Sequence, residues 1–172
     1  MDTRSVAQIK FDALVRLIMQ NTLAGILPIY LVTEYQKSGG SWVGQLISEY
    51  LGIPFPRNKI PRIEKCVLHG HVLPTPFLRN VVCVFRDGRD AVVSSYFHML
   101  FENEKNSPHL VTRTRGALSF KDYNDVEANL PLFMEYLFER HHMRSVFRPN
   151  QFTWTEFVRR WHGTCSRTRL YR

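Results

Sequence analysis

The sequence predicts a single α/β domain, spanning residues 1–172, with an open parallel sheet flanked by helices. Two continuous apolar runs, residues 29–32 and 81–85, lack alternating polar residues and are typical of strands buried on both faces of a parallel sheet. Each run leads through a short polar turn into apolar residues at helical spacing. Repetition of strand, turn and helix is the pattern of α/β proteins.

Composition is compatible with a folded, anion-binding protein. A hydrophobic content of 44% argues against disorder, and the net charge of +8 attracts anionic cofactors, nucleic acids or acidic membranes. No nucleic-acid-binding motif accompanies the arginines near the end of the chain, so a nucleic-acid partner is not expected. The three cysteines lack C-x-x-C spacing, which favours reduced thiols and a cytoplasmic location.

The first predicted element is an amphipathic helix near the N-terminus that packs on the core. Its apolar stripe recurs at helical spacing and consists of Phe11, Leu14, Val15, Ile18 and Met19. The following segment, residues 17–32, is rather apolar, but polar residues and a proline interrupt it. It therefore falls short of the roughly 20 apolar residues that a membrane span needs, and we expect no stable membrane anchor.

The turn after the strand at residues 29–32 predicts an anion site. It consists of Lys37, Ser38, Gly39, Gly40 and Ser41, and a helix with apolar residues at helical spacing follows it. Glycines allow the backbone to approach a ligand, and a helix N-terminus offers unpaired N–H groups. The lysine precedes the glycines, unlike the order in a nucleotide-binding Walker A loop. The alternative interpretation is an ordinary turn with a surface lysine.

A second candidate site follows the strand at residues 81–85, which is predicted to be central. Arg86 stands at the carboxyl end of this strand, where open α/β sheets place their ligands. Its guanidinium can bind a phosphate through two hydrogen bonds, and Ser94 on the following helix can add a hydroxyl. Alternatively, Arg86 pairs with Asp87 or Asp90 and only braces the turn.

Two histidines lie between these motifs. His69 and His71 follow the apolar residues 66–68 and precede a Leu-Pro pair. Together the three motifs resemble sulfotransferases that use 3′-phosphoadenosine 5′-phosphosulfate (PAPS). That family carries Tyr-Pro-Lys-Ser-Gly-Thr-Thr-Trp where residues 35–42 read Tyr-Gln-Lys-Ser-Gly-Gly-Ser-Trp. It also carries Lys-Thr-His before Leu-Pro, and an arginine followed eight residues later by a serine.

The resemblance, which covers about residues 25–172, implies a P-loop-NTPase-like fold and a role for each matching residue. The 5′-phosphosulfate would be bound by Lys37, Ser38, Gly39, Gly40 and Ser41. Trp42 would stack on the adenine, and Arg86 with Ser94 would hold the 3′-phosphate. His71 would be the general base, with His69 as the alternative, and Lys37 would offset charge on the leaving group. The reaction needs no metal and releases adenosine 3′,5′-bisphosphate.

The first motif also departs from the family pattern. Gln36 replaces a proline and Gly40 replaces a threonine, so we expect weaker binding of the donor. Glu34 places a carboxylate beside the anion site, and this is unfavourable unless its side chain points away.

The later part of the chain predicts a loop and two helices. Residues 101–125 are polar and are expected to form a long, mobile loop on the acceptor side. One helix is indicated by Leu130, Phe133, Met134, Leu137 and Phe138. Another is indicated by Trp154, Phe157, Val158 and Trp161, with Thr153 or Thr155 as its cap.

Residues 168–172 match the start of a further strand, but the basic Arg-Lys-Gly segment of the family is absent from the sequence. We therefore expect that the C-terminal part of the fold is missing and that an exposed sheet edge permits homo-oligomers. Two functions stay open. One is transfer of a sulfuryl group to a hydroxyl or amine of a small-molecule or glycan acceptor. The other is a non-catalytic relative that only binds adenosine bisphosphate.

Overall fold

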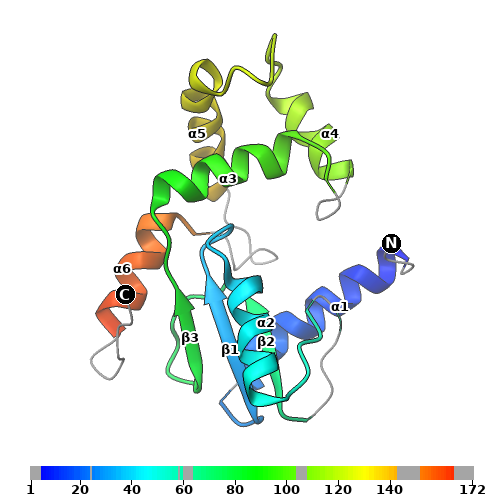
Figure 1. The fold of residues 1–172 in the computed structure, drawn as a ribbon, viewed down its shortest axis with the longest axis vertical. Coiled ribbons are helices and arrows are strands. Elements are labelled where there is room, and N and C mark those ends of the chain that lie inside the picture. Colours follow the sequence, from blue (N-terminus) through cyan, green and yellow to red (C-terminus); the bar gives the residue numbers. More distant parts are fainter. Residues whose placement is uncertain are drawn as a thin grey trace. The chain divides into compact units, whose positions relative to one another are not determined.

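A computed structural model of the chain describes residues 5–23, 25–57, 59, 64–103, 108–142 and 152–164. The chain divides into two compact units, one containing residues 1–85 and 157–172 and the other residues 86–156. The described residues form an α/β structure with a small parallel sheet flanked by helices (Figure 1). This confirms the predicted class of fold.

The sheet of the first unit contains β1 (Ile29–Glu34), β2 (Cys66–Gly70) and β3 (Val81–Val84). All described pairings are parallel, and the strand order is β2-β1-β3. β1 is therefore central, and its residues Leu31 and Val32 are fully buried. The prediction that residues 81–85 form a central strand is wrong for the described sheet, where β3 is a half-buried edge strand.

Helix α2 (Gly40–Leu51) begins directly after the turn that follows β1 and packs against β1 and β2. Its N-cap is Gly39, whose φ of 101° is left-handed, and it ends at Gly52 with a φ of 63°. Glycine adopts both conformations without a steric penalty, so the sequence fixes both ends of the helix. This places the N-terminus of α2 at the carboxyl end of β1.

The N-terminal helix α1 (Val6–Ile18) forms as predicted and leads into a π-helical turn, η1 (Met19–Leu23). Ser5 and Gln8 cap its start with a reciprocal pair of hydrogen bonds. The expected packing of its apolar stripe is largely wrong, because Phe11 and Leu14 are 60% and 54% exposed. Only Met19 at the end of the stripe is buried. Within the described ranges, no helix has both the length and the apolarity required to cross a bilayer.

The second unit contains α3 (Gly88–Leu100), α4 (Pro108–Ala117) and α5 (Val126–His142). The predicted loop at residues 101–125 is wrong where α4 forms. Val111 and Thr114 are three residues apart, so they share one helix face, and both are buried. The core of the unit consists of Tyr96, Met99, Leu100 and Phe133.

The last described helix, α6 (Trp154–Thr164), agrees with the sequence prediction. Thr153 Oγ1 accepts a hydrogen bond from the Glu156 N–H at 3.1 Å, as an N-cap does. Phe157 and Trp161, which belong to the first unit, are buried. The strand predicted at residues 168–172 lies outside the described residues.

Candidate functional site

The turn between β1 and α2 is tightly wound, and several of its N–H groups donate to the protein's own oxygens. Lys37 has a φ of 67°, which is uncommon for a residue with a side chain. The N–H groups of Trp42 and Val43 both donate to the Gly39 carbonyl, at 3.0 and 3.1 Å. The Ser38 hydroxyl is buried and has no hydrogen-bond partner among the described residues. A buried, unpaired hydroxyl in such a turn is a donor that a ligand can use.

The predicted loop residues differ in accessibility. Ser38 and Gly40 are buried, Lys37 and Ser41 are half-buried, and Gly39 is exposed. Trp42 is 72% exposed, so one face of its ring is accessible for stacking.

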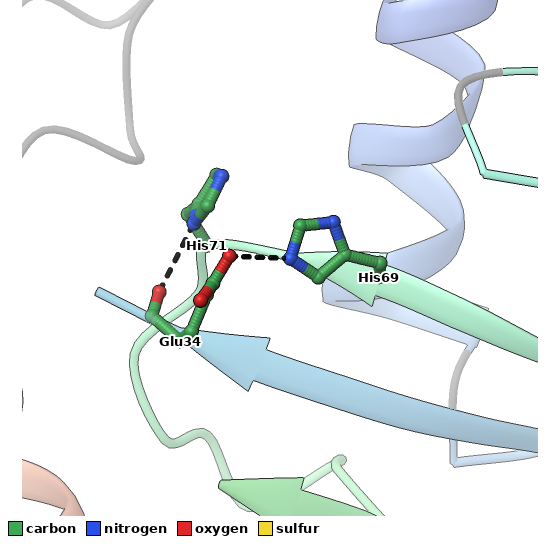
Figure 2. A group of neighbouring side chains, drawn as sticks. All are labelled: Glu34, His69 and His71. Atoms are coloured by element: carbon green, nitrogen blue, oxygen red, sulfur yellow. Dashed lines mark hydrogen bonds and ion pairs between the residues drawn. The ribbon is translucent and has the colours of Figure 1, made fainter. Parts of the chain in front are cut away.

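Glu34, the last residue of β1, accepts a hydrogen bond from this turn. It also accepts hydrogen bonds from both histidines (Figure 2). One carboxylate oxygen, Oε1, accepts a hydrogen bond from His69 Nε2 at 2.8 Å. The other, Oε2, accepts from the N–H of Gly40. The backbone carbonyl of Glu34 accepts from His71 Nδ1 at 3.0 Å. Glu34 therefore does not point away from the turn, and the two donors that satisfy its carboxylate hold it beside the predicted anion site.

The strand pairing explains why these residues meet. Val32 of β1 lies opposite His69 of β2, so the carboxyl ends of both strands reach the same edge of the sheet. His69 and His71 flank Gly70 at the end of β2, and their ring centroids lie 5.1 Å apart, so both side chains occupy the same face at this edge. This face is the one that carries the turn before α2.

The backbone around His69 is held by the N-terminal helical segment. Arg16 Nη2 and Gln20 Nε2 both donate to the His69 carbonyl, at 2.8 and 2.9 Å. A Cβ at Gly70 would lie 2.5 Å from Gln20 Nε2, so a larger residue there would displace the Gln20 amide from the His69 carbonyl. The glycine between the two histidines therefore has a packing role.

The backbone after His71 is held equally firmly. The Val72 N–H donates to Thr33 Oγ1, and the Thr33 hydroxyl donates to the Val72 carbonyl, both at 3.1 Å. Trp161 Nε1 donates to the same carbonyl at 3.0 Å. His71 is thus fixed by contacts to β1 and α6 as well as by its own ring.

The surroundings of Glu34 keep its carboxyl group ionised. Burial by itself raises the pKa of this group, but the hydrogen bonds from His69 and Gly40 outweigh burial, and the pKa lies below its ordinary value. Glu34 is therefore a carboxylate at neutral pH and can only accept hydrogen bonds.

The surroundings of His71 keep its ring neutral. Burial is the main reason that the pKa of His71 lies below its ordinary value, and nearby His69 lowers it further. The hydrogen bond to the Glu34 carbonyl opposes this shift without reversing it. Because a carbonyl cannot donate, the proton of the neutral ring resides on Nδ1, and Nε2 carries the lone pair.

Gly40 gives a test of this arrangement. A Cβ at position 40 would lie 2.8 Å from Glu34 Cδ and 2.9 Å from His69 Nε2, so Gly40→Ala should displace the pair. We expect a loss of about 1–3 kcal/mol in the free energy of unfolding, measured by urea denaturation. Gly163→Ala is the control, because among the described residues no atom outside its neighbours and its own helix backbone lies within 4 Å of a Cβ there, and alanine favours the helix. If Gly40→Ala and Gly163→Ala changed the free energy of unfolding equally, close packing at Gly40 would be contradicted.

Arg86 and Ser94 belong to the second unit. Arg86 Nε lies 3.6 Å from Asp90 Oδ2, so the ion pair considered from the sequence is present. Trp154 Nε1 donates to the Arg86 carbonyl at 3.0 Å, and Ser94 is half-buried on α3. Asp87 caps α3, and its hydrogen bonds with Arg89 lower its pKa to about 2. The predicted 3′-phosphate role of Arg86 and Ser94 stays a prediction.

Sequence reasoning found the turn and both histidines but missed the role of Glu34. A signal was present, because Glu34 ends one predicted parallel strand and the histidines end another. Parallel strands carry their functional groups at a common edge, so the three side chains could have been grouped in advance.

Comparison with known proteins adds no assignment. No protein-family model matches the chain, and no curated protein or solved structure is significantly similar to it.

Proposed function

We propose that this protein is a sulfotransferase that transfers a sulfuryl group from PAPS to a hydroxyl or amine acceptor, with His71 as general base. The observation that carries the proposal is the position of Glu34 between the two motifs. Its carboxylate accepts from Gly40 in the turn, and its carbonyl accepts from His71. The turn and the imidazole therefore share one edge of the sheet.

The turn has several properties of an anion site. It precedes a helix of 12 residues, whose N-terminus carries partial positive charge. The buried Ser38 hydroxyl supplies a donor, and Lys37 supplies a full positive charge within the same turn. These groups suit the 5′-phosphosulfate of the donor.

His71 has the properties of a proton acceptor. Its neutral ring carries a lone pair on Nε2, while Nδ1 is held by the Glu34 carbonyl. In the proposed reaction the acceptor oxygen or nitrogen forms a bond to sulfur as the bond from sulfur to the leaving phosphate oxygen breaks. His71 takes the proton of the acceptor, and Lys37 offsets the negative charge that develops on the leaving phosphate.

Binding of the product tests the first half of the proposal. Calorimetry at low salt should detect adenosine 3′,5′-bisphosphate and should show weaker binding of adenosine 5′-monophosphate, which lacks the 3′-phosphate. Absence of any binding to the bisphosphate would refute the proposal. A transfer assay with radiolabelled donor and a panel of hydroxyl and amine acceptors tests the second half.

Lys37→Ala should lower the transfer rate by about 10²–10³-fold, the usual effect of removing one electrostatic contact to a developing charge. Lys37→Arg is the control, since it keeps the charge but changes its geometry, and it should retain more activity. Initial rates at saturating donor measure the effect. A Lys37→Ala rate equal to that of the unmodified protein would disprove the role given to this lysine.

A non-catalytic function is the second candidate, and two features of Gly40 favour it. Gly40 lacks the hydroxyl that the family carries, and its N–H already donates to Glu34. Both features reduce the number of groups available to the donor. Binding of adenosine 3′,5′-bisphosphate without transfer to any acceptor in the panel would support this second function.

A further inference from the structure

We propose that Glu34, His69 and His71 bind a divalent transition-metal ion of the Zn²⁺ type. Each residue offers one ligand atom, and the three atoms lie within 4.8 Å of one another. Two imidazoles and one carboxylate form the ligand set of many catalytic zinc sites. Hard cations such as Mg²⁺ prefer several oxygen ligands, and this cluster provides only one carboxylate.

The geometry needs little change to accept such an ion. The two rings lie on different sides of the Glu34 carboxylate (Figure 2), and their planes meet edge to face, at 78° with centroids 5.1 Å apart. Zinc bonds to nitrogen and oxygen are about 2.0–2.2 Å long, so two ligands of one ion lie at most about 4.4 Å apart. The separations in the cluster, up to 4.8 Å, exceed this limit by at most about 0.4 Å, so the side chains need to close only slightly around an ion.

Contacts around the cluster hold the ligands in position. The second carboxylate oxygen of Glu34 is held by the Gly40 N–H, and the His69 backbone by Arg16 and Gln20. Outer contacts of this kind orient metal ligands and sharpen their affinity. A metal ion on His69 Nε2 would replace the hydrogen bond to Glu34 Oε1, and the proton of the neutral ring would then reside on Nδ1.

The metal site does not depend on the proposed transferase activity, but the two uses of His71 exclude each other. A neutral imidazole has one lone pair, and a metal ion on either ring nitrogen takes it. Zn²⁺ bound at this cluster therefore removes the proposed base.

Metal binding is tested on the untagged chain of residues 1–172 without nucleotide. Calorimetry with Zn²⁺ should give one site per chain that Mg²⁺ does not fill, and Co²⁺ should produce visible absorption bands. We expect a loss of Zn²⁺ affinity of at least about 10–100-fold, the usual effect of removing a group that only orients a ligand. This loss should appear in each of three variants, Glu34→Gln, His69→Gln and His71→Gln. His162→Gln is the control, because this exposed histidine lies on α6. The proposal would be overturned if these three substitutions lowered the affinity for Zn²⁺ no more than His162→Gln does.

A measurement on the unmodified protein avoids any folding defect of the variants. X-ray absorption at the zinc edge should show nitrogen and oxygen ligands with imidazole scattering. Sulfur ligands, from Cys66 or Cys83 for example, would overturn the assignment, as would absence of Zn²⁺ binding altogether.

Discussion

Replacing His71 by alanine should lower the rate of sulfuryl transfer by about 10²–10⁴-fold, the contribution that a general base typically makes. The affinity for adenosine 3′,5′-bisphosphate should change little, because the predicted anion ligands are the turn and its lysine. Transfer assays and calorimetry on the same preparation separate these effects. Burial lowers the pKa of His71 below its ordinary 6.5, so the acid limb of kcat/KM should lie below pH 6.5.

The matched variant for this test is His69→Gln. His69 donates to the Glu34 carboxylate, so its loss removes a partner of a buried charge without removing the proposed base. We expect His69→Gln to be less stable than the unmodified protein but more active than His71→Ala. Activity that survives His71→Ala and disappears in His69→Gln would show that His69 is the base.

The second large effect concerns stability. Phe133 of α5 is fully buried, and its ring lies 5.2 Å from that of Tyr96, edge to face. Phe133→Ala should leave a cavity in the core of the second unit and lower the free energy of unfolding by about 3–5 kcal/mol. Urea denaturation followed by circular dichroism measures this loss.

Phe138→Ala is the control for the cavity. Phe138 lies on the same helix but is 50% exposed, so its truncation removes fewer contacts. We expect a loss of no more than about 1 kcal/mol. Equal losses from Phe133→Ala and Phe138→Ala would show that the core of the second unit does not centre on Phe133.

The sequence allowed prediction of the strands and of most helices because local patterns determine them. Residues 29–32 and 81–85 are apolar enough to indicate strands, and apolar residues at helical spacing after residue 41 indicate the following helix. The position of each strand within the sheet depends on long-range pairing, which no local pattern encodes. For this reason the edge position of β3 could not be predicted.

The two wrong expectations about packing have a common cause. From the sequence, the apolar stripe of α1 is expected to be buried and residues 101–125 are expected to form a mobile loop. Burial of an apolar side chain is energetically favourable, but it occurs only where the fold provides residues that can pack against it. Phe11 remains exposed, while Thr114, a polar residue, is fully buried.

The candidate site was partly predictable for a similar reason. The turn and the histidines carry a recognisable order and spacing, so their chemistry could be inferred one motif at a time. The role of Glu34 could not be inferred from its own motif, because whether its carboxylate is stabilised at this position depends on the residues that contact it. Beside an anion site a carboxylate is unfavourable, but with donors from His69 and Gly40 it is stabilised.

The hydrogen bond between Gly40 and Glu34 has a consequence for ligand affinity. An incoming phosphate or sulfate that takes the Gly40 N–H must displace the carboxylate of the protein itself. The measured affinity for the ligand then reflects the difference between binding the free anion and releasing the Glu34 carboxylate. In the Glu34→Gln variant the side chain is uncharged, so an incoming anion no longer competes with a carboxylate. This variant should therefore bind free phosphate or sulfate more tightly than the unmodified protein does.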